Sequence, residues 1–127
     1  MSRFEEYDLY TRNKDFLVSD SIITFTDTNG VLMALKPDVT LSIIKDSTDI
    51  TGSVKKVYYN ENVYRVSKGT QSFKEIMQTG LECIGDVDEY IICETLYLAA
   101  KSLESISKDF ILDISHMELI SEEIKAL

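Results

Sequence analysis

A chain of 127 residues is long enough to form one domain with its own core. Its 22 acidic residues outnumber 13 basic ones, and the net charge of -9 disfavours nucleic-acid binding, which depends on Lys and Arg contacts to phosphates. The sequence has no apolar run of membrane-spanning length and no signal-peptide pattern, so we expect no membrane association and a cytoplasmic protein.

The first third of the chain predicts a hairpin. Residues 4–13 are acidic and tyrosine-rich, with aromatic side chains at helix-like intervals, and predict a short amphipathic helix or turn. Residues 19–26 and 31–35 are rich in β-branched and aliphatic side chains and predict strands. Between them, Asn29-Gly30 readily supplies the positive φ of a tight turn, so the two strands are expected to pair.

A short helix is predicted after Pro37, because proline fits the first turn of a helix. Asp38 or Thr40 can accept hydrogen bonds from the free N–H groups at its start, and Leu41 to Lys45 continues the helix. On spacing alone, capping is the favoured role for Asp38. Residues 46–53 form a polar connection without a pattern of their own.

Three strands are predicted in the middle of the chain. Residues 54–59 form the first, which turns at Asn60-Glu61 into the second, residues 62–66. The polar loop from Ser67 to Phe73 contains a Lys-Gly-Thr turn signal and leads into the third strand, residues 74–85.

The third strand alternates polar and apolar side chains. Gln78, Gly80 and Glu82 share one face, and Met77 and Leu81 lie on the other, which we expect to be the core face. The glycine between the amide and the carboxylate leaves room for a small ligand against the backbone. The alternative is an antiparallel sheet that merely exposes one polar face to water.

Arg65 is expected to face away from the core, whereas Tyr64 and Val66 face it. If Arg65 shares the face of Gln78 and Glu82, three polar groups converge on one sheet surface. The register of the strands decides this, because a slip of one residue reverses the faces.

The last part of the chain predicts a helix over residues 88–107, a strand over 108–115 and a helix from His116 onward. The apolar stripe of the long helix comprises Ile92, Leu96, Ala99, Leu103 and Ile106. His116 lies at a strand-to-helix junction, where a turn-stabilising role is favoured. About six strands in consecutive hairpins, with helices, predict an α+β domain with a mainly antiparallel sheet flanked by helices.

Neither a metal nor an organic cofactor is predicted. Cys83 and Cys93 are too few and wrongly spaced for a structural zinc site. Because both lie among apolar residues, we expect buried free thiols in a reducing compartment.

Several short segments, in their common order and spacing, resemble the histidine branch of the class II aminoacyl-tRNA synthetase fold. They are Phe4–Asp8, Phe25–Asp27, Leu35–Thr40, Val63–Arg65, Lys74–Gln78, Leu81–Gly85 and Asp113–His116. That branch contains histidine-tRNA ligases and the non-catalytic regulatory subunits of ATP phosphoribosyltransferase. The resemblance implies that residues 1–127 form a single class II synthetase-like core domain, a partial chain without the start of motif 1 and without motif 3.

The resemblance also implies a ligand site. Asp38 and Thr40 match the positions that hold the amino group of histidine, Gln78 and Glu82 match positions that also hold the amino acid, and Arg65 matches the motif 2 arginine that meets the α-phosphate of ATP. The chemistry agrees, since carboxylates bind an ammonium group and a guanidinium binds a phosphate or carboxylate. No catalytic residue is implied.

Two features make the chain more similar to the regulatory subunits than to the ligases. Asp38-Val39-Thr40 replaces the acid-glycine-threonine of most ligases, and the basic pair of the motif 2 loop is reduced to Ser72 and Lys74. The leading hypothesis is therefore a non-catalytic regulatory subunit of ATP phosphoribosyltransferase, required for the first step of histidine biosynthesis.

That hypothesis implies a catalytic subunit as partner, histidine as a feedback effector, and a homodimer in the full-length family. The alternative is a fragment of the catalytic core of a histidine-tRNA ligase. A third reading is a scaffold whose polar sheet face binds nothing.

Overall fold

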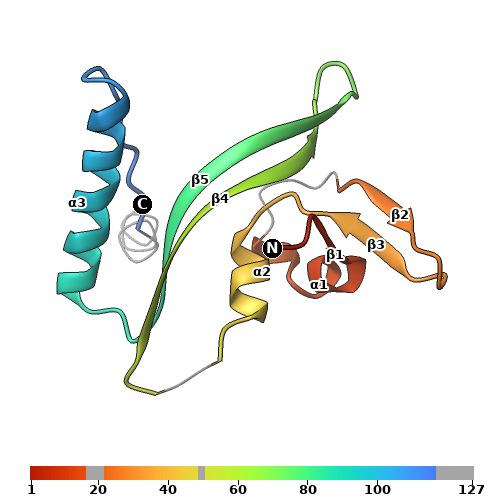
Figure 1. Ribbon diagram of the computed structural model, residues 1–127, viewed down its shortest axis with the longest axis horizontal. Helices are drawn as coiled ribbons and strands as arrows, with labels where there is room; N and C mark the ends of the chain where they lie inside the picture. The colour runs from red at the N-terminus through yellow and green to blue at the C-terminus, as the bar shows by residue number, and fades with distance from the viewer. Residues whose placement is uncertain (17–21, 49–50, 117–127) are drawn as a thin grey trace, which may run out of the picture. The chain divides into compact units, whose positions relative to one another are not determined.

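The computed structural model describes residues 1–16, 22–48 and 51–116, and the chain divides into two compact units, the second of which begins at Glu89. The described residues form an α+β structure in which all strand pairs are antiparallel (Figure 1). In chain order, the elements are β1 (Phe4–Glu6), α1 (Tyr7–Arg12), the 3₁₀ helix η1 (Lys14–Phe16), β2 (Thr24–Thr26), β3 (Leu32–Leu35), α2 (Thr40–Lys45), β4 (Val54–Val66), β5 (Phe73–Gly85) and α3 (Glu89–Ile106).

The predicted hairpin is confirmed as β2 and β3, which belong to a three-stranded sheet in the order β1-β3-β2. The turn closes because Asp27 Oδ1 accepts hydrogen bonds from the N–H groups of Asn29 and Val31, and Gly30 has the positive φ that the turn requires, 81°. The helix predicted over residues 4–13 is confirmed for Tyr7–Arg12, whereas Phe4–Glu6 forms β1. Residues 19–21 of the first predicted strand lie outside the described residues.

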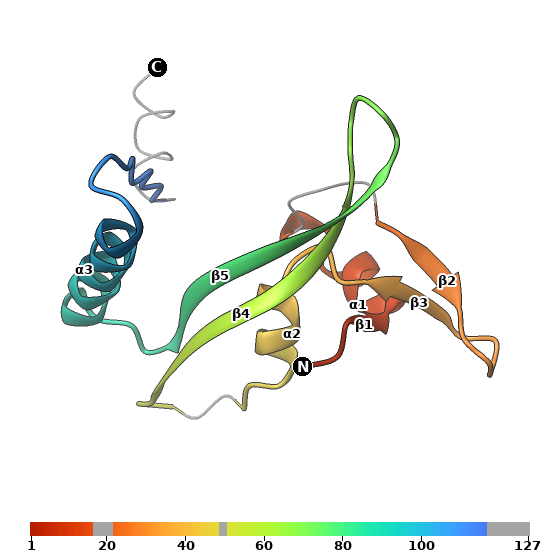
Figure 2. The ribbon, with the colours of Figure 1, turned by 45° about the horizontal axis from the view of Figure 1, so that its top comes forward.

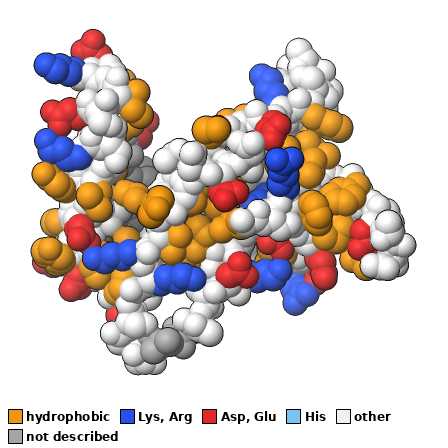
Figure 3. All heavy atoms as spheres, in the orientation of Figure 1, with side chains coloured by type: hydrophobic (Ala, Val, Ile, Leu, Met, Phe, Trp, Pro, Cys, Tyr) orange, Lys and Arg blue, Asp and Glu red, His pale blue; other side chains and the backbone are white. Residues whose placement is uncertain are grey.

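The two faces of the three-stranded sheet differ in burial. On one face Ala34 is fully buried beside Tyr10 of α1 and Leu41 of α2. On the other, Phe4 and Phe25 meet edge to face, with ring centroids 5.6 Å apart. In the space-filling view, hydrophobic side chains gather over this sheet (Figure 3).

A single long hairpin replaces the three strands predicted for the middle of the chain. β4 runs unbroken for 13 residues and pairs with β5 over its whole length, so the predicted turn at Asn60-Glu61 is wrong (Figure 2). These two residues stay in the ladder, and Asn60 Oδ1 accepts a hydrogen bond from Thr79 Oγ1 at 3.0 Å. The reversal is where predicted, between Ser67 and Phe73, although the positive φ falls on Gln71 and not on the glycine of the loop.

The core face of the hairpin is the opposite of the predicted one. Val63 is fully buried and Tyr59 is 8% exposed, and both pack against Val39 and Ile43 of the α2 segment. Met77, predicted to face the core, is 70% exposed. The physical reason is that the apolar pair on β4 shares the face of the polar side chains of β5, and the hydrophobic effect favours covering that pair with α2.

α2 begins at Thr40, three residues after Pro37, and ends at Lys45. The N-cap residue of α2 is Val39, which makes no side-chain cap hydrogen bond. Asp38, one residue earlier, accepts a hydrogen bond from the N–H of Thr40 at 2.7 Å, so its predicted contact with a free N–H group at the start of the helix is confirmed. Two hydrogen bonds to backbone carbonyls join the segment before α2 to β4. The Tyr64 N–H donates to Lys36 O at 2.8 Å, and the Arg65 Nε–H donates to Pro37 O at 3.1 Å.

The second unit contains α3, which confirms the helix predicted over residues 88–107. The predicted stripe is wrong in part: Ile91 is the buried residue of the helix, whereas Ile92 is 43% and Ile106 84% exposed. Residues 108–115 form no strand, so that prediction is also wrong, and His116 is exposed. The final helix falls on residues 117–127, which lie outside the described residues.

Both cysteines are free thiols, as predicted, but their burial differs from the prediction. Cys83 is half-buried and Cys93 is exposed on α3. Among the described helices, none combines the length and the apolar character that crossing a membrane requires.

Candidate functional site

The structure brings all five predicted site residues together where α2 begins beside the β4–β5 hairpin. The register of the hairpin places Arg65 on the same face as Gln78 and Glu82, because strand residues two apart share a face and directly paired residues lie on one side. Asp38 and Thr40 approach this face from the start of α2.

Thr40 and Glu82 connect α2 to β5. The Thr40 hydroxyl donates a hydrogen bond of 2.6 Å to Glu82 Oε1, and the Thr40 N–H donates to Asp38 Oδ1. A single threonine therefore holds two carboxylates in place. Hydrogen bonds to a carboxylate are stronger than those between neutral groups, so this contact fixes both acidic side chains.

Arg65 and Gln78 form the other half of the network. Arg65 Nη2 donates to Gln78 Oε1 at 3.3 Å while its Nε donates to Pro37 O. The guanidinium is thus held by a backbone carbonyl and by an amide, both neutral groups. Within the described residues it makes no ion pair, so its charge stays available to an anionic group.

Asp38 and Glu82 are carboxylates without a cation. Asp38 is only 8% exposed, and in the described part of the chain neither acid forms an ion pair with a lysine or arginine. Lys36, two residues before Asp38, is fully buried, but its Nζ has no hydrogen-bond partner among the described residues. Partly buried carboxylates are usually paired, so an ammonium group of a ligand would complete this site.

Tyr59 is a member of the site that the sequence analysis missed. Its Oη accepts a hydrogen bond of 3.0 Å from Gln78 Nε2, and its ring lies over Gly80, its partner across the hairpin. A Cβ at residue 80 would lie 2.8 Å from Tyr59 Cε1 and closer still to Cζ and to the hydroxyl oxygen Oη. The prediction that Gly80 leaves room for a ligand is therefore wrong, because the tyrosine ring occupies that space.

The environment of Tyr59 keeps its hydroxyl protonated. Burial raises the pKa of Tyr59 above its ordinary value of 10.0, the hydrogen bond from Gln78 opposes that shift, and the negative charges of Glu82 and Asp38 add to it. The signal that could have revealed this residue is an aromatic side chain directly across from a strand glycine, which is visible only once β4 is recognised as unbroken.

The arrangement offers groups of both signs to a small zwitterion. Two carboxylates suit an ammonium group, and a guanidinium and an amide suit a carboxylate or phosphate.

Two surface pockets of the first unit are lined by other residues: one lies beside Ser47 and Lys55, and the other beside Glu5 and Arg12. Among the described side chains, no cluster of three His, Cys, Asp or Glu could hold a metal ion.

Comparisons with known proteins agree on one family. The family model described as histidyl-tRNA synthetase matches residues 2–127. An ATP phosphoribosyltransferase regulatory subunit of Caldanaerobacter subterraneus subsp. tengcongensis is 36% identical over 93% of this chain and 32% of its own length. A protein of the same description from Oceanobacillus iheyensis is 27% identical over 94% of this chain and 30% of its own.

Enzymes are also among the similar proteins. A histidine--tRNA ligase of Archaeoglobus fulgidus is 25% identical over 98% of this chain and 31% of its own length. The chain thus spans about a third of the length of the curated relatives it matches.

Proposed function

The chain belongs to the histidyl-tRNA synthetase family, and from this premise we propose that it is part of a non-catalytic regulatory subunit of ATP phosphoribosyltransferase. In this proposal, residues 1–127 form a partial class II synthetase-like core domain. The chain acts with a separate catalytic subunit in the first step of histidine biosynthesis, and its full-length form is a homodimer. Identity reaches 36% with a named regulatory subunit, against 27% with a named histidine--tRNA ligase, and this difference supports the regulatory role. We place it in the cytoplasm, where free thiols persist.

Histidine is the proposed ligand of the site. We assign its ammonium group to Asp38 and Glu82, with Thr40 holding both acids, and its carboxylate to Arg65 and Gln78. The observation that carries this assignment is that, among the described residues, Asp38 and Glu82 form no ion pair and neither does Arg65, which bonds to the carbonyl of Pro37 beside Asp38. Each charge of the amino acid then meets an opposite charge that the protein leaves unneutralised.

Feedback regulation follows if histidine binds one state of the complex better than the other. A ligand shifts a conformational equilibrium only by its difference in affinity between two states. The site joins α2 to both strands of the hairpin through side chains far apart in sequence, so filling it would favour the state in which these elements are held together. The regulatory subunit is proposed to transmit that preference to the catalytic subunit.

Calorimetric titration with histidine tests the site in the natural full-length protein. Glu82→Gln keeps the shape of the side chain and removes its charge, so we expect histidine affinity to fall at least about tenfold. Glu75→Gln is the matched control, because Glu75 lies on the same strand but on the opposite face, where it bonds to Asn62 and Tyr64. Equal affinities of the two variants would refute the assignment.

A histidine-tRNA ligase core is the alternative, and the similarity to the ligase of Archaeoglobus fulgidus is the observation in its favour. An assay of ATP–pyrophosphate exchange on the full-length protein separates the two functions. The regulatory proposal predicts no histidine-dependent exchange, together with stimulation of the catalytic subunit of ATP phosphoribosyltransferase. Histidine-dependent exchange would establish the ligase.

A further inference from the structure

Tyr59 stands between the two halves of the proposed site. Its ring packs against Val39 and Val63 in the core, and its hydroxyl reaches the amide of Gln78. The side chain therefore couples a hydrophobic contact with α2 to the orientation of a polar group that faces the ligand.

The polarity of the Gln78 amide is fixed by its two partners. Arg65 has only donors, so the amide must turn its oxygen, Oε1, toward that guanidinium. The amide nitrogen then faces Tyr59, whose hydroxyl accepts one of its two hydrogens at 3.0 Å. Among the described residues, one N–H of Nε2 and one lone pair of Oε1 have no further partner and can meet a ligand.

We propose that Tyr59 is a positioning residue of the amino-acid site, which acts by holding the Gln78 amide in its ligand-binding orientation. This inference rests on the proposed function, because it concerns the same histidine site. Tyr59 stays neutral at physiological pH, so its oxygen remains an acceptor for the amide and adds no charge beside the two acids. The ring supplies the rigidity, since it is wedged between Gly80 and the α2 segment.

Gly80 is the structural partner of this tyrosine. It lies directly opposite Tyr59 in the ladder, and its φ is not in the left-handed region, so its backbone does not require glycine. What requires glycine is the space that the ring fills. The ring therefore lies over the position between Gln78 and Glu82, which are on either side of Gly80 along β5.

Tyr59→Phe tests the inference, because phenylalanine keeps the ring over Gly80 and removes the hydroxyl alone. In the natural full-length protein, we expect histidine affinity to fall about three- to tenfold, the loss typical of one neutral hydrogen bond. The side-chain NH₂ resonance of Gln78, identified by its disappearance in Gln78→Glu, should shift in the absence of ligand. Tyr64→Phe is the matched control, since Tyr64 donates to Glu75 on the other face of the hairpin and should leave both readouts unchanged.

The possible results separate the two proposals. A shifted Gln78 resonance with weakened histidine binding in Tyr59→Phe, and no change in Tyr64→Phe, supports the positioning role. Unchanged histidine affinity in Tyr59→Phe, while the parent binds histidine, overturns the positioning role and leaves the proposed function intact. A parent protein that binds no histidine overturns both.

Discussion

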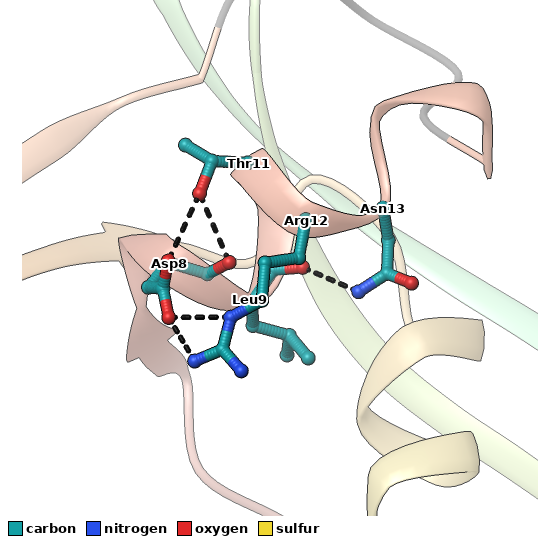
Figure 4. A network of polar contacts seen from close by, with 5 residues as sticks. All are labelled: Asp8, Leu9, Thr11, Arg12 and Asn13. Atoms are coloured by element: carbon teal, nitrogen blue, oxygen red, sulfur yellow. Dashed lines mark hydrogen bonds and ion pairs between the residues drawn. The ribbon is translucent and has the colours of Figure 1, made fainter.

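Two polar networks in the first unit have similar chemistry and very different settings. In α1, Asp8 accepts hydrogen bonds from Thr11 and forms an ion pair with Arg12, while Asn13 caps the carbonyl of Leu9 (Figure 4). Each of these contacts joins residues three or four apart in sequence, and most of them are exposed to water. At the site, by contrast, the bond between Thr40 and Glu82 joins residues 42 apart in sequence and is partly buried.

The two networks are expected to contribute differently to the free energy of unfolding. Exposed local pairs stabilise a helix only slightly, because water screens the charges and the side chains lose entropy. Partly buried contacts between distant segments meet a lower effective dielectric, and an unsatisfied group there is costly. We therefore expect perturbations at the site to matter most, and those at α1 to matter least.

The largest effect is expected for Gly80→Ala. The added methyl group overlaps the Tyr59 ring, so the ring must leave its place between β5 and α2. Overpacking of this kind lowers the free energy of unfolding by roughly 1–3 kcal/mol, measured by urea denaturation of the chain. Two controls sharpen the test: Gly69→Ala has open space and should change little, and Gly80→Ala should cost much less in a Tyr59→Leu background.

A smaller loss is expected for Thr40→Val, which keeps the shape of the side chain but removes the donor to Glu82. Losing a hydrogen bond to a partly buried carboxylate should lower the free energy of unfolding by about 1–2 kcal/mol. Thr79→Val is the matched control, because its hydroxyl bonds to the neutral and exposed Asn60 on the outer face of the hairpin. Equal losses of unfolding free energy in Thr40→Val and Thr79→Val would mean that the partly buried hydrogen bond contributes no more than the exposed one.

The same contrast explains which features the sequence could predict. The turn at Asn29-Gly30, the hydrogen bond between Asp38 and the start of α2, and the helix α3 depend on neighbours within a few residues, and all three are present. The convergence of Arg65 with Gln78 depends on register, which only the pairing of two complete strands determines.

The misplaced break at Asn60-Glu61 had a further consequence. A chain that turned at Asn60-Glu61 could not pair Tyr59 with Gly80 across the hairpin. The predicted turn therefore led to the wrong core face and left Tyr59 out of the site. Polar residues in the middle of a strand look like a turn when their cross-strand partner, here Thr79, is unknown. Family resemblance predicted five candidate site residues, whereas the Tyr59 ring that fills the space over Gly80 is visible only in the fold.

At alkaline pH, ionisation of Tyr59 should lower the free energy of unfolding, by less than Gly80→Ala or Thr40→Val lowers it at neutral pH. Its pKa is raised in the folded chain, chiefly by burial, so its contribution to stability is complete below the ordinary value of 10.0 and is lost as pH rises through the folded-state pKa. Stability should therefore fall above about pH 10. In Tyr59→Phe that fall should be shallower, as measured by urea denaturation between pH 8 and 11. A parallel decline in both proteins would contradict the shift.

The smallest effect is expected at α1, where Asp8→Asn removes the ion pair with Arg12. The pKa of Asp8 is lowered from 3.8, chiefly by its hydrogen bond with Arg12, so its contribution is present above that value and disappears as the pH falls through the lower, folded-state pKa. At pH 7 the variant should unfold at a slightly lower urea concentration than the parent, and the two should coincide in strong acid. Because both side chains are mostly exposed, salt at about 1 M should also remove the difference. A difference that persists in salt, or that matches the loss in Thr40→Val, would mean that the surface network contributes as much as the buried one.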